Sequence, residues 1–213
     1  MHVPKLFRSQ RANFVGELLA AQPWALLVTA VDANLRGSHL PFVHEPAIEG
    51  HGCLHGHMNR ANPHWRDLQR ADEAMVVFTG PGVYVSPEIY EVTPAAPSYN
   101  YTAVHAYGTP FLIDDAEQTL MFLRETVERF ERGPGGRGWD IEPSLEYARR
   151  IVRGVVAFTI DITRVEAAAK LSQNKTPELQ DRVETAFANS AAAAARAVAS
   201  EMRQEREANA GRT

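Results

Sequence analysis

Residues 55–65 contain three of the eight histidines of this chain, together with an arginine and two asparagines. Histidine titrates near neutral pH, and its neutral imidazole is the commonest metal ligand in proteins. His55 and His57 alternate, so on a strand they would face the same side. His64 directly follows Asn62-Pro63, where we expect a helix to begin. This stretch therefore predicts a centre that binds a metal, transfers protons or holds an anion.

The composition excludes several other kinds of site. The single cysteine, Cys53, excludes an intrachain disulfide and any cysteine-rich zinc or iron–sulfur site. A net charge of -4 with both signs interspersed gives no basic surface for nonspecific nucleic-acid binding. The longest apolar run, residues 24–31, is too short to span a bilayer. We therefore expect a cytoplasmic protein with no membrane or nucleic-acid partner.

The first half of the chain predicts a helix, a strand hairpin, a third strand and a short helix, in that order. Their expected ranges are 10–21, 24–31 paired with 35–43, 52–58 and 63–70. A Val- and Phe-rich strand is expected over 74–79. Gly80-Pro81-Gly82 is expected to turn the chain into a separate strand over 83–86.

The second half predicts two long strands separated by helices. The expected strands are 99–113 and 155–165, and the expected helices are 115–132, 143–152 and 177–208. Six or seven strands without regular β-α alternation predict an antiparallel barrel of the α+β class. We expect a barrel domain over 1–176 and a helical extension over 177–213. Its apolar residues Phe187, Val198 and Met202 are expected to pack on the barrel or on a partner subunit.

Five sequence blocks are spread over nearly the whole chain. They are Ser38-His39-Leu40-Pro41, Gly56-His57 with Arg60-Ala61-Asn62-Pro63, Tyr84-Val85-Ser86-Pro87, Asn100-Tyr101 with Val104-His105-Ala106-Tyr107-Gly108, and Lys170-Leu171-Ser172-Gln173-Asn174. In composition and order, these blocks resemble the PaiB-like FMN-binding negative transcriptional regulators. The resemblance implies a split β-barrel homodimer with a planar cofactor near the subunit interface.

The chain also departs from that family in one region. Ile89 and Tyr99 stand where the family usually carries tryptophan, and the segment between them looks shorter and has no lysine. Because this loop would help to shape a flavin or regulatory site, the change argues against FMN binding and a repressor role.

Three segments are similar to the haem-dependent piperazate synthases, a branch of the same family. These segments are residues 57–65, Thr93-Pro94-Ala95-Ala96-Pro97 and Gly138-Trp139-Asp140. This resemblance implies haem b as cofactor and N5-hydroxy-L-ornithine as substrate, which forms an intramolecular N–N bond and loses water to give L-piperazate. The alternatives are an FMN-binding PaiB-like regulator and a flavin-binding split-barrel protein, including a flavin-dependent oxidoreductase.

The resemblance also assigns roles to individual residues. His64 is the first candidate for the axial ligand of iron, because a rigid element would hold its imidazole and leave the opposite face of iron open; His57 is the second. Ordinary structural roles, such as a surface position for His64, are the alternatives, and His55 is expected to be scaffold. The other expected cofactor contacts are Arg60, His39, Lys170, Ser172 and Gln173. The candidates that would protonate the departing oxygen are Tyr99, Tyr101 and Lys175.

Overall fold

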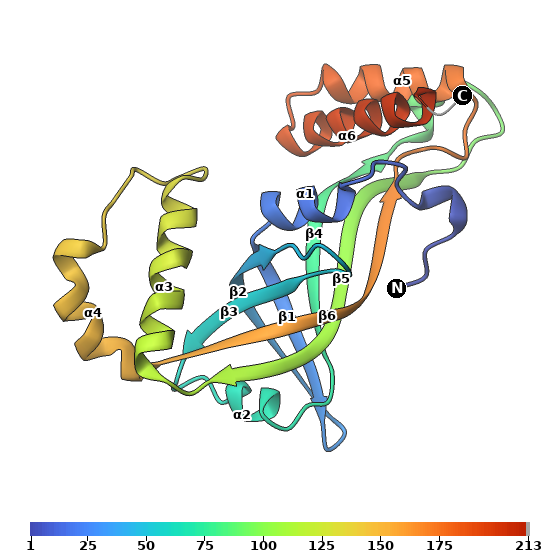
Figure 1. The fold of residues 1–213 in the computed structure, drawn as a ribbon. Helices are drawn as coiled ribbons and strands as arrows, with labels where there is room; N and C mark the ends of the chain where they lie inside the picture. Colours follow the sequence, from blue (N-terminus) through green and yellow to red (C-terminus); the bar gives the residue numbers. More distant parts are fainter. Residues whose placement is uncertain (212–213) are drawn as a thin grey trace. The chain divides into compact units, whose positions relative to one another are not determined.

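The computed structural model of the chain describes residues 1–211, which form a closed six-stranded barrel in the order β1-β2-β3-β6-β5-β4 (Figure 1). The strands are β1 (Trp24–Val31), β2 (Asn34–Glu45), β3 (Cys53–Asn59), β4 (Ala74–Val85), β5 (Ser98–Ile113) and β6 (Val155–Lys170). β1 pairs antiparallel with β2 and β4, and β3 pairs antiparallel with β2 and β6. The predicted α+β class with an antiparallel barrel is confirmed.

Six α-helices and four short 3-10 helices accompany the strands in the described part of the chain. The helices are α1 (Phe14–Ala21), α2 (His64–Leu68), α3 (Ala116–Glu131), α4 (Leu145–Ile151), α5 (Pro177–Ala188) and α6 (Ala193–Ala210), with η1 (Lys5–Phe7), η2 (Pro87–Tyr90), η3 (Glu142–Ser144) and η4 (Val152–Gly154). Asp115 caps α3 by accepting a hydrogen bond from the Gln118 amide at 2.8 Å. None of the helices within residues 1–211 combines the length and apolar character needed to cross a membrane.

The alternation of side chains along β3 gives the strand a core face and an outer face. Leu54, Gly56 and Met58 are buried, whereas His55 and His57 between them are only partly covered. A side chain at Gly56 would collide with aromatic rings of β2 and β6, so glycine allows the barrel to close tightly there. The two histidines therefore lie on the outside of the barrel wall.

The described residues divide into two compact units. The first unit comprises residues 1–22, 78–105 and 165–211, and the second comprises 23–77 and 106–164. The predicted division into 1–176 and 177–213 stays a prediction, and its last two residues lie outside the described part.

The predicted turn at Gly80-Pro81-Gly82 is wrong, because β4 runs straight through these residues. A Cβ atom at Gly80 would lie 2.1 Å from Thr102 Oγ1 and 2.7 Å from Leu18 Cδ1. The residue at position 80 must therefore be small so that helix α1 and strand β5 can approach the backbone of β4. Here glycine reflects close packing rather than a change of chain direction.

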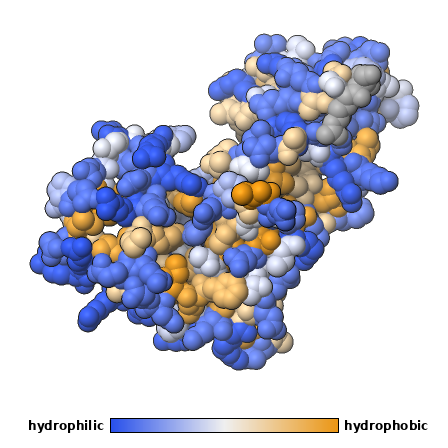
Figure 2. All heavy atoms as spheres, in the orientation of Figure 1, coloured by the Kyte–Doolittle hydropathy of each residue, from blue (hydrophilic) through white to orange (hydrophobic). Residues whose placement is uncertain are grey.

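The single helix predicted over 177–208 is two helices, α5 and α6, which pack against each other. Phe187, Val198 and Met202 are buried at 5%, 0% and 1% exposure, so they are part of the core of the chain and not an exposed partner surface. Hydrophilic residues dominate the visible outside of this helix pair (Figure 2). The expected role of these three residues in subunit contact is corrected accordingly.

Candidate functional site

His64 is fully buried in the second unit, and both of its ring nitrogens are hydrogen-bonded. Nε2 lies 2.9 Å from Thr29 Oγ1 on β1, and Nδ1 lies 2.9 Å from Ser38 Oγ on β2. Asn62 fixes the start of α2, because its side-chain oxygen accepts a hydrogen bond from the His64 amide at 3.1 Å. Burial lowers the pKa of His64, so the ring is neutral near pH 7.

These contacts give His64 the role of a bridge between α2 and two strands. A neutral imidazole has one donor and one acceptor nitrogen, and a hydroxyl group satisfies each of them here. Iron could bind His64 only if the bond to Thr29 or to Ser38 were released. The ligand role of His64 stays a prediction, and this geometry disfavours it.

His57 lies on the outer face of β3 and is bonded differently. Its Nδ1 atom is buried and has no hydrogen-bond partner within residues 1–211. Burial also lowers the pKa of His57, which keeps the ring neutral. The ring of Phe122 from α3 covers one side, edge-on to His57 at 6.2 Å and stacked on His55 at 5.5 Å. His57 is therefore a neutral imidazole whose buried Nδ1 atom makes no hydrogen bond within the described residues.

The other two predicted histidines of the second unit, His55 and His39, each contact a neighbouring side chain on the barrel wall. His55 Nε2 lies 2.8 Å from a carboxylate oxygen of Glu45, an arrangement that fits its expected scaffold role. His39 is exposed on the outer face of β2, and its ring stacks with that of Trp24 at 6.3 Å and an interplanar angle of 16°. His39 thus forms a stacked aromatic pair with Trp24 on the outside of the barrel wall.

Arg60 is engaged with the main chain rather than open to an anion. Its Nε and Nη2 atoms donate hydrogen bonds to the carbonyls of Arg153 and Val155 at 2.8 and 3.1 Å. Trp65 donates its indole N–H to the Arg60 carbonyl at 3.0 Å. Arg60 therefore ties the turn after β3 to the start of β6, and the N–H groups left for the predicted contact with a cofactor are those of Nη1 and one of Nη2.

The predicted cluster after β6 belongs to the first unit. Ser172 is 2% exposed, and its hydroxyl and the Asn100 side chain are joined at 2.9 and 3.1 Å. The Gln173 side chain accepts from the Leu171 amide at 2.7 Å and donates to the Ala169 carbonyl at 2.5 Å. Both side chains stabilise the local chain, so their predicted contact with a cofactor would require these bonds to be shared or exchanged.

The two predicted lysines of the first unit lie over aromatic rings. Lys170 Nζ is 5.8 Å from the ring centre of Phe7, and Lys175 Nζ is 4.6 Å from that of Tyr90. At these distances the ammonium groups are attracted to the ring faces. This contact holds the Lys170 side chain against Phe7 and the Lys175 side chain against Tyr90.

Tyr99 and Tyr101 face outward from β5 on the same side of the strand. Tyr99 is 50% exposed and Tyr101 is partly buried. A Cβ atom at Gly82 of β4 would lie 3.1 Å from the Tyr99 ring and 3.3 Å from Tyr101 Cβ, so the absence of a side chain there makes room for both tyrosines. The two predicted proton donors therefore share one face of the first unit.

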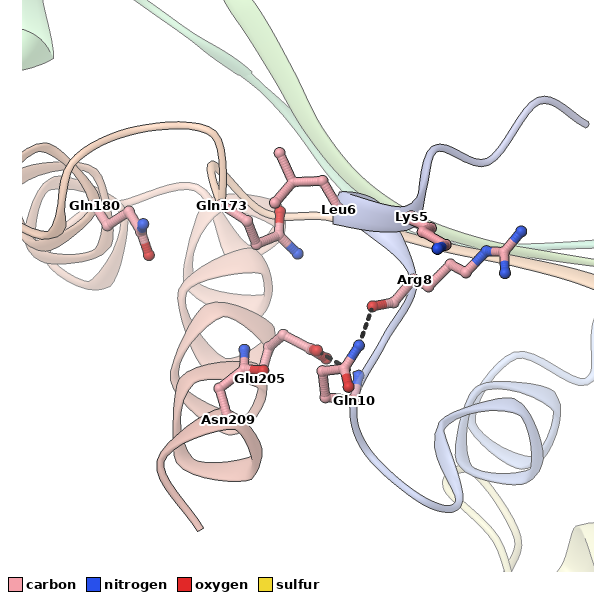
Figure 3. Close-up of a pocket in the computed structure, with 8 residues that line it drawn as sticks. All are labelled: Lys5, Leu6, Arg8, Gln10, Gln173, Gln180, Glu205 and Asn209. Carbon is pink, nitrogen blue, oxygen red and sulfur yellow. Dashed lines mark hydrogen bonds between the residues drawn. The ribbon is translucent and has the colours of Figure 1, made fainter. Parts of the chain in front are cut away.

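A cavity of about 530 Å³ in the first unit was not predicted (Figure 3). It is lined by Lys5, Leu6, Arg8, Gln10, Gln173, Gln180, Glu205 and Asn209. Glu205 is 2% exposed, and its carboxylate accepts hydrogen bonds from the Ser9 hydroxyl and the Gln10 amide, both at 2.6 Å. The available signal was the position of Glu205 three residues after Met202, on the buried stripe of the helix. Gln173 links this cavity to the predicted site residues.

The predicted site residues thus form two sets, one in each unit. His39, His57, Arg60 and His64 belong to the second unit, and Tyr99, Tyr101, Lys170, Ser172, Gln173 and Lys175 belong to the first. Within residues 1–211, no three or more histidine, cysteine or acidic side chains converge as a metal-binding group. A metal carried by a cofactor would therefore depend on a single protein ligand.

Comparison with known proteins places this geometry in a known family. Residues 1–164 match the family described as "Putative FMN-binding domain". The chain is 29% identical over 178 residues to the protease synthase and sporulation protein PAI 2 of Bacillus subtilis, covering 82% of this chain and 83% of that protein.

Two solved structures share the fold. The FAD and heme binding protein from Mycobacterium smegmatis matches with a TM-score of 0.57 and 17% identity, covering 81% of this chain and 78% of that one. The flavocytochrome Anf3 from Azotobacter vinelandii matches with a TM-score of 0.56 and 15% identity, covering 79% and 72%. These likenesses confirm the predicted split-barrel fold.

Proposed function

The chain belongs to the family of FMN-binding domains with the PaiB-like split-barrel fold, and from this premise we propose that it binds haem b and acts as a piperazate synthase. The substrate would be N5-hydroxy-L-ornithine and the product L-piperazate. Support for a haem or flavin cofactor comes from the family description and from the two structural neighbours, whose names state haem or flavin binding.

The observation that carries the proposal is the unpaired Nδ1 atom of the His57 imidazole. A haem needs one neutral protein imidazole whose nitrogen can reach iron. His57 is kept neutral by burial, and its Nδ1 atom makes no hydrogen bond within the described residues. A buried polar atom without a partner costs about 1–3 kcal/mol, so a ligand that changed how this ring is bonded would remove that cost. Because both nitrogens of His64 are occupied, we assign the ligand role to His57.

The proposed reaction is balanced without an external oxidant or reductant. The N–O bond of the hydroxylamine breaks, the α-amine forms a bond to the same nitrogen, and the amine proton leaves with the hydroxide as water. Bound haem would supply Lewis acidity toward the N–O oxygen. The protein would hold the amine close to the nitrogen, which can remove much of the barrier to ring closure. Tyr99, Tyr101 and Lys175 stay the proposed proton donors.

The proposed assembly is a homodimer with the cofactor near the subunit interface, as the family resemblance implies. Sedimentation velocity of the purified protein would give its mass directly. The expected result is a species of twice the chain mass, and a monomer at all concentrations would contradict the proposed assembly.

FMN is the second candidate cofactor, because the matched family is named for it. The test is to titrate the purified apoprotein with haem and with FMN separately and to record visible spectra. Haem binding with a Soret band is the expected result. The haem-loaded protein is then incubated with N5-hydroxy-L-ornithine, and piperazate is measured by mass spectrometry. Uptake of FMN with refusal of haem, or a haem protein that forms no piperazate, would overturn the proposal.

Single substitutions test the ligand assignment. His57→Ala should abolish or strongly shift the Soret band. His55→Ala is the matched control, because His55 lies two residues away on the same face of β3 and is bonded to Glu45. His64→Gln keeps groups that can hydrogen-bond to both hydroxyls and should leave the band in place. Loss of the band in His64→Gln but not in His57→Ala would return the ligand role to His64.

A further inference from the structure

Four residues of the second unit form one row across the outer face of the barrel. Trp24 lies opposite Pro41, and His57 lies opposite Ala157. The ladder between β2 and β3 ends at Phe42 opposite Gly56, and Pro41 and His57 are the residues that follow this last pair on their two strands. The row therefore runs from Trp24 on β1, through Pro41 and His57, to Ala157 on β6.

The side chains in this row differ in size and exposure. Neighbouring strands are about 4.8 Å apart, so the Trp24 and His57 backbones are separated by about 10 Å along the row. Pro41 lies between them and presents only a short ring. Trp24 is 63% exposed and stacks with His39, whereas His57 contacts the ring of Phe122, which is 7% exposed. Phe122 therefore covers part of His57, while the indole of Trp24 on β1 is open to a ligand.

We propose that Trp24 stacks on the planar cofactor that His57 binds; this inference rests on the proposed function. A planar ligand attached at His57 and extending over Pro41 reaches the indole two strands away. An exposed indole gains contact area and aromatic stacking when a conjugated ring system covers it. His39 stacks on one side of the indole, and the 63% exposure of Trp24 leaves much of its ring system to a ligand. Trp24 is a positioning residue for the cofactor in this arrangement.

The test uses Trp24→Leu in the full-length apoprotein, with the dissociation constants for haem and FMN measured by absorbance titration. Loss of one aromatic stacking partner should weaken binding of the planar ligand about tenfold. The rate of haem transfer to excess apomyoglobin should rise by a similar factor. Tyr147→Leu is the matched control, because Tyr147 is 58% exposed on α4 of the same unit and lies outside the row. Circular dichroism checks that both variants are folded.

The outcomes separate this inference from the proposed function. If the wild-type protein binds neither haem nor FMN, both the proposed function and this inference are overturned. If it binds one of them and Trp24→Leu binds it equally well, only the role of Trp24 is overturned. A Trp24→Leu variant that changes the sedimentation coefficient but not the dissociation constant would assign Trp24 to contact between copies of the chain and would also overturn the inference.

Discussion

The hydrogen bond between Thr29 and His64 predicts a measurable coupling energy. Thr29 is 2% exposed, His64 is fully buried, and the two side chains are 2.9 Å apart. His64→Phe fills the space but removes both ring nitrogens. It loses two hydrogen bonds, each with a net value of about 1 kcal/mol, and leaves the Thr29 hydroxyl buried without a partner. We expect a loss of roughly 3 kcal/mol in the free energy of unfolding.

The companion variant removes the other half of the same bond. Thr29→Val deletes the hydroxyl and leaves His64 Nε2 unpaired, at an expected cost of about 1–3 kcal/mol. The double variant carries no stranded polar group at this contact, so its loss should be smaller than the sum of the single losses by about 1–2 kcal/mol. Urea unfolding at pH 7.5, followed by circular dichroism, gives all four free energies. Thr163→Val, at an exposed threonine of β6, serves as the control and should change stability by less than about 0.5 kcal/mol.

Additive losses in this cycle would refute the reasoning. They would mean that the Thr29 hydroxyl does not hold His64 Nε2 in solution. His64 would then have a nitrogen free for iron, and the assignment of the ligand role to His57 would lose one of its two supports. The cycle therefore tests a structural bond and the choice between two ligands in a protein that needs no cofactor for the measurement.

Three further predictions concern protonation and packing. Burial lowers the pKa of His57 and His64 below 6.5, so as pH falls the unfolded chain binds protons at these histidines before the folded protein does. The contribution of the two histidines to the free energy of unfolding should be complete above about pH 6.5 and should decrease below it. A flat profile of the free energy of unfolding in urea titrations from about pH 8 to pH 5 would contradict this. Gly80→Ala should lower the free energy of unfolding by about 1–3 kcal/mol, because its Cβ atom has no room. Gly154→Ala is the control: no atom lies within 4 Å of the added carbon, so the free energy of unfolding from urea titration should change little. Burial raises the pKa of Cys53 from 9.0 to about 11, so iodoacetamide at pH 8 should modify it about a hundredfold more slowly than an ordinary thiol, and an ordinary rate would show that the thiol is accessible.

Periodicity and breaker residues predicted most of the elements because their signals are local. The strand over 24–31 was predicted at its observed bounds, and the segment 99–113 starts one residue after β5 does. Gly80 was misread because the same residue type serves turns and close packing, and only the position of Thr102 on a neighbouring strand decides between them. The break between α5 and α6 was missed because alanine is helix-forming on both sides of it.

The predicted site was harder to read, because the same residue types serve scaffold and function. Ser172 and Arg60 were chosen for their hydroxyl and guanidinium groups, which can bind a cofactor. In the structure, those groups are used by Asn100 and by main-chain carbonyls. Such partners become visible only after the chain has folded, because Asn100 lies 72 positions from Ser172 in the sequence. A polar residue type therefore states what a side chain can do, and its partners determine what is left for a ligand.

The three histidines of residues 55–65 also differ in how many of their ring nitrogens the folded chain leaves without a partner. His55 is bonded to Glu45, which lies at the end of the neighbouring strand, so the hairpin pairing alone could have suggested that contact. The partners of His64 lie 35 and 26 positions earlier, on two strands that meet α2 only in the folded unit. His57 has no such partner for its Nδ1 atom within the described residues. The histidine with the most favourable sequence context is therefore the one whose ring nitrogens already have partners, and for this reason we propose His57 as the ligand.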